Sequence, residues 1–140
     1  MEINYFGKAP TRANANDAGN DLYAFGIKRK KRYIEYYTRT HINIPKGYVG
    51  LLCPRSSTSD YDLFLANGVG VIDSGFIGEI RVRYKVIPTI WNLFGLMPKK
   101  YKVGDKIAQL IIMPFEFVDW HFTTKLEETE RGEKGFGSSS

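Results

Sequence analysis

The sequence is poor in the residues that form disulfides and metal centres. It has one cysteine, Cys53, and two distant histidines, His41 and His121. A single cysteine excludes an internal disulfide and suits a reducing compartment, and the histidines lack the spacing of a zinc site. The first residues also lack the basic and then apolar pattern of a signal peptide. We therefore expect a cytoplasmic protein, or one inside a host cell if the chain is viral.

Long apolar runs are also missing. No stretch reaches the roughly 18 consecutive apolar residues that a transmembrane helix needs, so we expect no membrane partner. The chain has 140 residues, of which 43% are hydrophobic and 14% aromatic. This length and composition are enough for one packed domain with one core.

Helical periodicity is scarce, whereas short apolar runs alternate with turn residues at intervals typical of strands. The pattern predicts strands over residues 3–6, 21–25, 33–37, 41–44, 48–53, 63–66, 81–87, 106–113 and 115–122. Many short strands without a convincing helix predict an all-β barrel or sandwich. We expect residues 1–126 to form this single domain. Residues 127–140 are charged and glycine-rich, which predicts a mobile tail.

The charge balance favours the positive sign, with a net charge of +5, and this suits anionic partners. The densest basic run, residues 28–32, lies between two apolar segments, and we interpret it as a solvated loop. A nucleic-acid contact or a targeting signal is the alternative. Residues 88–100 form a dense apolar cluster around Trp91. We expect this cluster to pack on its own sheet, with a surface for a protein partner as the alternative.

The stretch at residues 67–82 has the sequence NGVGVIDSGFIGEIRV. Two β-rich arms flank a turn that contains Asp73, Gly75, Phe76 and Gly78, and we expect the arms to form a hairpin. Glycine opens backbone conformations closed to other residues and lets a ligand approach the main chain. An acid at a strand end beside such a turn is well placed for chemistry, although Asp and Gly are also the default residues of an ordinary turn.

Five polar or glycine-rich segments lie between the strands. They are AGNDL at 18–22, PRSS at 54–57, the stretch at 67–82, GDKIAQL at 104–110, and RGEKGFGSS at 131–139. In this order and spacing they resemble the five motifs of the homotrimeric dUTP diphosphatase (dUTPase) family. The resemblance implies a jelly-roll-like β-barrel and a homotrimer with shared active sites. It also implies hydrolysis of dUTP to dUMP and diphosphate, which keeps uracil out of DNA and supplies dUMP for thymidylate synthesis.

Several polar residues are suited to the triphosphate. Arg55 offers planar, permanently charged donors, and Ser56 and Ser57 add hydroxyls and turn amides. Taken alone, this segment equally fits a solvated loop. The resemblance implies that these three residues hold phosphate, and it completes the set with Gln109, Arg131, Gly135 and Gly137.

The resemblance gives Asp73 the central catalytic role. This residue would hold the deoxyribose 3′-hydroxyl and orient or deprotonate the attacking water, and an ordinary aspartate is ionised at neutral pH. A narrow hairpin that contacts the base through its main chain can exclude the 5-methyl group of thymine sterically. It can also reject cytosine, because the exocyclic amine of cytosine reverses the donor and acceptor pattern and would leave buried groups unpaired. The implied base and sugar contacts are Asn67, Val71, Ile72, Asp73, Phe76, Arg81 and, from the tail, Phe136.

The resemblance also implies Mg²⁺ as cofactor. Asp21 resembles the aspartate of the first motif, which acts near the metal through water, although it equally fits a pairing with Arg55 or a turn cap. No carboxylate cluster in the sequence forms an all-protein cage, which suits an ion held mainly by phosphates and water. Three chains would share each site: one gives Asp21, Arg55, Ser56 and Gln109, the second the hairpin, and the third the tail, which orders when substrate binds.

The sequence departs from the family pattern at two positions. Phe76 stands where a tyrosine is common, and Gly75 where many members have a second acid. The stretch also resembles dCTP deaminase, but Arg83 replaces the glutamate that deamination needs and Asp60 replaces a second arginine. The remaining alternatives are a catalytically weak, dUTPase-like regulatory binder and a basic barrel that binds single-stranded nucleic acid. We expect dUTP as substrate and no nucleic-acid partner.

Overall fold

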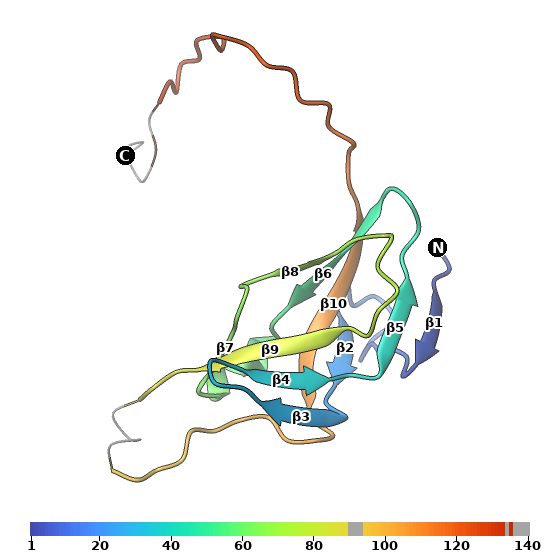
Figure 1. The fold of residues 1–140 in the computed structure, drawn as a ribbon. Helices are drawn as coiled ribbons and strands as arrows, with labels where there is room; N and C mark the ends of the chain where they lie inside the picture. Colours follow the sequence, from blue (N-terminus) through green and yellow to red (C-terminus); the bar gives the residue numbers. More distant parts are fainter. Residues whose placement is uncertain (90–93, 134, 136–140) are drawn as a thin grey trace.

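The computed structural model describes residues 1–89, 94–133 and 135. It contains two four-stranded antiparallel sheets, which Figure 1 shows forming the body of the molecule. The first has the order β2 (Asn20–Tyr23), β10 (Lys106–Pro114), β6 (Tyr48–Cys53) and β8 (Gly70–Ile72). The second has the order β3 (Gly26–Arg29), β4 (Ile34–Tyr37), β9 (Arg81–Val86) and β7 (Leu63–Leu65). β1 (Asn4–Gly7) pairs with β5 (Thr40–Asn43), and the short 3-10 helix η1 spans Ser56–Asp60.

The all-β prediction is confirmed, because the described residues contain no α-helix. The core draws on both large sheets: Leu22, Ile107 and Leu110 come from the first, and Tyr36 and Tyr84 from the second. The strands alternate buried and exposed positions, as a half-buried sheet requires. The hydroxyl of Tyr84 donates to the carbonyl of Ile107 at 2.6 Å and so joins the two sheets through the core.

The structure differs from the predicted strands in two places, since one observed strand was missed and one predicted strand is wrong. β3 was not predicted, because its sequence GIKR has a single large apolar residue and runs into the basic segment; it pairs with β4 along one edge only. The predicted strand at 115–122 is absent from the structure. A strand needs a neighbouring edge, and here the residues Phe117, Trp120 and Phe122 are 78%, 91% and 94% exposed.

The predicted hairpin at residues 67–82 is also wrong in its pairing. β8 pairs with β6, whereas β9 pairs with β4 and β7, so the two arms belong to different sheets. β8 is the last strand of its sheet, and no strand among the described residues pairs with its outer edge. The separated arms therefore leave a gap in which main-chain groups remain available.

The chain leaves the body of the molecule after β10. Figure 1 shows the following residues, in orange and red, arching away from the sheets. Residues 115–133 are exposed throughout. The division at residue 126 stays a prediction. No helix in the described part of the chain is long and apolar enough to cross a membrane.

Candidate active site

A pocket of about 220 Å³ lies between the end of β8 and the start of β9. It adjoins a wider, open recess that shares Leu52, Asn67, Phe76, Glu79 and Arg81 with it. The pocket is lined by every described residue that was predicted to contact base or sugar: Asn67, Val71, Ile72, Asp73, Phe76 and Arg81. Phe136, the remaining member of that set, lies outside the described residues.

The turn before β8 directs Asn67 toward the pocket. Gly68 has a φ of +68°, a left-handed conformation that glycine adopts without strain. The N–H of Gly68 donates to the carbonyl of Leu65 at 3.0 Å, and the N–H of Val69 donates to that of Asn67 at 2.7 Å. A Cβ at Gly70 would lie 3.2 Å from Asn67 Nδ2. Glycine at that position therefore makes room for the carboxamide over the strand.

Asp73 directly follows β8 and opens a tight turn, in which its carbonyl accepts a hydrogen bond from the N–H of Phe76 at 3.0 Å. Its side chain is exposed, and its carboxylate has no partner among the described residues. The ring of Phe76 lies against Gly78, where a Cβ would come within 2.7 Å of the ring atom Cζ. The turn thus places an unengaged carboxylate beside an aromatic face that is held by contact with a glycine.

Glu79 fixes the far side of the turn and was not predicted. It accepts from the N–H of Arg39 at 2.9 Å and from Arg81 Nε at 3.3 Å, and Arg81 also lies over the ring of Tyr37. These contacts orient Arg81 at the mouth of the pocket. The only sequence signal was an acid two residues before an arginine, a spacing that places both side chains on one face of a strand.

Arg83, two residues further along β9, is engaged with Glu35 at 2.9 Å. Burial alone would raise the pKa of Glu35, but hydrogen bonds from Arg83 and Tyr37 outweigh it and leave the pKa below its ordinary value. The position at which a deaminase needs a glutamate is therefore occupied by a cation with a structural partner.

A second polar group is centred on Asp21 of β2. Arg55 Nε donates to Asp21 Oδ1 at 2.8 Å, and Lys106 Nζ lies 2.8 Å from Asp21 Oδ2. Arg55 also donates to the hydroxyl of Ser57 at 3.1 Å. The hydrogen bond and the charge of Asp21 raise the pKa of Lys106, so this ammonium stays charged. The network has two cations and one anion, which is an excess of positive charge suited to phosphate.

Lys106 is the residue of this network that sequence reasoning missed. It lay inside a segment that resembled a family motif, but nothing in the local pattern distinguished it from other strand lysines. Gln109, which was predicted, pairs with Asp21 and Cys53 across β10 and donates to the carbonyl of Pro54 at 2.9 Å. A Cβ at Gly19 would collide with its carboxamide oxygen, so glycine there permits the close packing.

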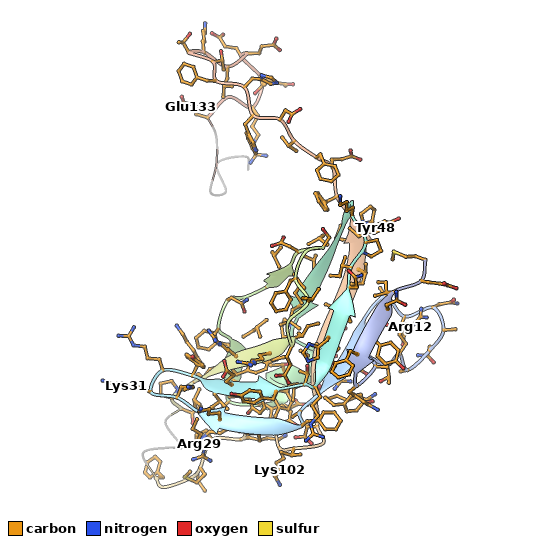
Figure 2. All side chains as sticks on the ribbon, turned by 45° about the vertical axis from the view of Figure 1, so that its right-hand side comes forward. Arg12, Arg29, Lys31, Tyr48, Lys102 and Glu133 are labelled. Atoms are coloured by element: carbon orange, nitrogen blue, oxygen red, sulfur yellow. The ribbon has the colours of Figure 1, made fainter. Side chains whose placement is uncertain are left out.

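The structure brings some of the predicted residues together and leaves others apart. Asp21, Arg55 and Ser57 form one network, while Ser56 is exposed at the start of η1. Among the described residues that line the pocket at β8, none belongs to the phosphate set. Arg131 and Gly135 lie on the tail, and Figure 2 shows Glu133, between them, far from the sheets. Gly137 lies outside the described residues. One chain therefore presents the parts of a nucleotide site separately.

The residues present fit a magnesium ion held through water. Both oxygens of Asp21 are paired with a cation, so direct ligation would displace Arg55 or Lys106. A carboxylate has about four lone-pair positions, which leaves room to accept from a metal-bound water. Within the described ranges, no group of three His, Cys, Asp or Glu residues could hold a metal ion. This donor set suits an ion whose other ligands are phosphates and water.

Comparisons with known proteins agree on one family. The model of the family described as dUTPase matches residues 6–140. A deoxyuridine 5′-triphosphate nucleotidohydrolase of Leifsonia xyli is 36% identical over 135 residues, covering 94% of this chain and 85% of that protein. The enzyme of the same name from Swinepox virus is 39% identical over 133 residues, covering 93% and 87%.

Solved structures give the same result. The dUTPase of Staphylococcus bacteriophage 80alpha with dUpNHpp is similar to this chain, with a TM-score of 0.75 and 27% sequence identity. The match covers 99% of this chain and 98% of that one. The likeness therefore extends over the whole fold and is not confined to the motifs.

Proposed function

The chain belongs to the dUTPase family, and on that premise we propose that it hydrolyses dUTP to dUMP and diphosphate at the pocket beside β8. The reaction keeps uracil out of DNA and supplies dUMP for thymidylate synthesis. One observation supports this placement above the others. The six described residues expected to contact base and sugar come from β8, from β9 of the other sheet and from the turns beside them, and all of them line a single pocket.

The outer edge of β8 is the surface that would recognise uracil. An unpaired strand edge presents N–H and C=O groups in a fixed alternation, which matches the donor and acceptor edge of a pyrimidine. Asn67 adds a carboxamide from the turn. Cytosine, with its exocyclic amine, would leave buried groups unpaired, and such groups carry the full desolvation penalty. The ring of Phe76 would lie against the sugar.

Asp73 would act on the attacking water. Its carboxylate is exposed and has no partner among the described residues, so it is available to accept a proton or to hold the sugar 3′-hydroxyl. The water would attack the α-phosphorus, and the bond from this phosphorus to the bridging oxygen would break, which releases diphosphate. Arg55, beside Lys106 and Ser57, would bind the phosphate oxygens. Mg²⁺, with Asp21 as a partner through water, would neutralise charge on the triphosphate.

We propose a homotrimer with shared sites. The separation of the phosphate residues from the pocket at β8 supports it, since a second chain would bring the two groups together. The exposed rings of Trp120 and Phe122 also support it, because isolated soluble chains rarely expose such apolar runs. The third chain would contribute the tail with Arg131, Gly135, Phe136 and Gly137.

We propose that the protein works in the cytoplasm, or in the interior of a host cell. The free cysteine Cys53 supports a reducing compartment. The relatives named above include a bacterial and a viral protein, so they support either origin.

The substitution Asp73→Asn tests the catalytic proposal. It keeps the shape of the side chain and removes its basicity, so the protein should fold, bind dUpNHpp and lose turnover by roughly 10²-fold to 10⁴-fold, the usual contribution of a general base. Release of diphosphate from dUTP, with dCTP, dTTP and UTP alongside, measures the effect. Asp60→Asn changes another exposed carboxylate, on η1, and should leave turnover unchanged. Turnover near the wild-type rate in Asp73→Asn would exclude the proposed role.

Removal of residues 131–140 tests the role of the tail. This segment lies beyond all described strands, so the shortened chain should melt at the same temperature as the full one. We expect it to lose nearly all turnover, because Arg131 and the tail glycines would no longer cover the phosphates. Full activity in the shortened protein would show that the tail is dispensable.

A further inference from the structure

A basic recess lies at the tip of the hairpin formed by β3 and β4. Its volume is about 380 Å³. Figure 2 shows Arg29 and Lys31 at this end of the molecule, away from Tyr48. Cations from the hairpin, from β9 and from the segment before β10 converge on it: Arg29, Lys30, Lys31, Arg32, Lys85 and Lys100.

This charge is not compensated within the recess. The described residues that line it include no acid. None of the six cations takes part in an ion pair among the described residues. Like charges placed this close repel one another, so a bound anion would relieve the repulsion. The sequence showed only the run at 28–32, whereas the fold adds Lys85 and Lys100 from distant positions.

Two aromatic rings lie beside these cations. Phe64, on β7, is 46% exposed, and Lys85 Nζ lies 5.7 Å from its ring centroid. Tyr33, the residue before β4, is half-buried, and the guanidinium of Arg83 lies 4.8 Å from the centroid of its ring. An exposed ring next to lysines offers a stacking surface for a base together with contacts for its phosphates.

We propose that this recess binds single-stranded nucleic acid. The cations would follow the phosphate backbone, and Phe64 would stack on one base. The binding would be independent of sequence and would weaken steeply with salt, because phosphate contacts release counterions. This proposal differs from the expectation of no nucleic-acid partner. That expectation rested on the family resemblance and on the basic run at residues 28–32 alone.

The recess is distinct from the nucleotide pocket beside β8, although Tyr33 also lines the wider recess that adjoins this pocket. Arg81 lines that pocket and Lys85 lines the recess, and four residues of β9 correspond to roughly 13 Å of strand. The proposal therefore does not depend on the proposed hydrolysis, and either can fail without the other.

The local structure favours nucleic acid over a targeting receptor. A receptor for a basic peptide binds an extended segment, but here the run is held in a closed hairpin. The N–H of Lys30 donates to the carbonyl of Tyr33 at 2.9 Å, and Arg29 pairs with Ile34. The cations also come from three parts of the chain, which a linear peptide signal would not require.

Fluorescence anisotropy of a labelled oligothymidylate of about 16 residues, titrated with the full-length protein at several salt concentrations, tests the proposal. The double variant Lys30→Glu/Arg32→Glu should weaken binding at least tenfold and reduce the salt slope by about 0.7 for each phosphate that the protein no longer neutralises. Phe64→Ala should weaken it roughly tenfold. The control Lys46→Glu reverses another exposed lysine, two residues before Tyr48, and should have no effect.

All four proteins should give the same circular dichroism spectrum, which shows that they are folded, and they should hydrolyse dUTP at the same rate. The proposal is overturned if Lys46→Glu weakens binding as much as the double variant, or if the double variant binds like the wild type. Unchanged binding in a folded Phe64→Ala protein would overturn the stacking arrangement. Equal or tighter binding of polyglutamate of the same charge would assign the recess to an acidic protein and overturn the nucleic-acid proposal.

Discussion

At the scale of single residues, Phe76 and Gly78 show how a turn positions a ring. The ring of Phe76 packs against Gly78, and its atoms fill the space that a Cβ at residue 78 would occupy. Phe76 lacks the phenol that is common at this position in the family, so nothing but packing fixes its orientation. Gly78 therefore positions the ring of Phe76 by contact, whereas a tyrosine at the same place could also be held by a hydrogen bond from its phenol.

Gly78→Ala should displace this ring. The new Cβ would lie 2.7 Å from Cζ and 2.9 Å from Cε2 of Phe76, so the ring must rotate or shift. An off-rotamer ring costs about 1 kcal/mol, and we expect the KM for dUTP to rise about fivefold and selectivity against UTP to fall. Gly75→Ala is the matched control, since nothing lies within 4 Å of its added Cβ. Steady-state kinetics on both variants measure the difference, and equal KM values would contradict this role for Gly78.

Residues that act through the main chain or through a turn were predictable from the sequence, whereas residues that act through a distant partner were not. Asn67, Asp73 and Phe76 stand in one segment, and the resemblance of that segment to a family motif assigned them to one site. Lys106 joins the site through its ion pair with Asp21. That residue is 85 positions away in the sequence, and the two come together only when β10 pairs with β2. Strand register is a tertiary property, and one local pattern does not specify which strands meet.

At the scale of elements, apolar alternation located most strands to within one or two residues. The apolar alternation failed where the presence of a neighbouring strand determined whether a strand forms. β3 forms because β4 offers an edge, despite a sequence with two basic residues. Residues 115–122 alternate well but find no edge in their own chain. The arms at 67–82 were expected to pair with each other, but each pairs with another strand. The alternation of apolar residues thus predicts which segments tend to form strands, but it does not predict which strands pair.

Buried tyrosines on β4, on β9 and in the segment before β10 should make the fold sensitive to alkali. Burial raises the pKa of Tyr36 to about 12, and burial also raises the pKa of Tyr84 and Tyr101. In the unfolded chain these groups ionise near pH 10. Their raised pKa means that the contribution of these tyrosines to stability is constant below about pH 10 and falls as the pH rises from there toward about 12.

Melting temperatures measured from neutral pH to about pH 11 test this expectation. Tyr36→Phe removes one buried ionising group and loses only a 3.4 Å hydrogen bond to Tyr101, so its alkaline decline should be shallower than that of the wild type. Tyr5→Phe alters an exposed tyrosine and should follow the wild-type curve. Identical slopes for the three proteins would show that the core tyrosines do not determine the alkaline limit.

At the scale of the whole molecule, a single chain is incomplete in two ways. Its phosphate residues do not line the pocket at β8, and the segment after β10 exposes large rings. Both features have one explanation if neighbouring chains cover the rings and supply the phosphate contacts. Burying one such ring contributes about 2 kcal/mol, so Trp120 and Phe122 together are a substantial part of an interface.

Charged substitutions in this segment should therefore separate the chains. Light scattering should give the wild type three times the chain mass of 16.0 kDa. The double variant Trp120→Asp/Phe122→Asp should give one chain mass, because carboxylates would be buried without a partner in the trimer. It should also lose turnover while its sheets stay folded by circular dichroism. Val103→Asp places an acid on the exposed turn before β10 and should remain trimeric. A monomeric wild type with full activity, or a trimeric double variant, would exclude this segment as the element that joins the chains.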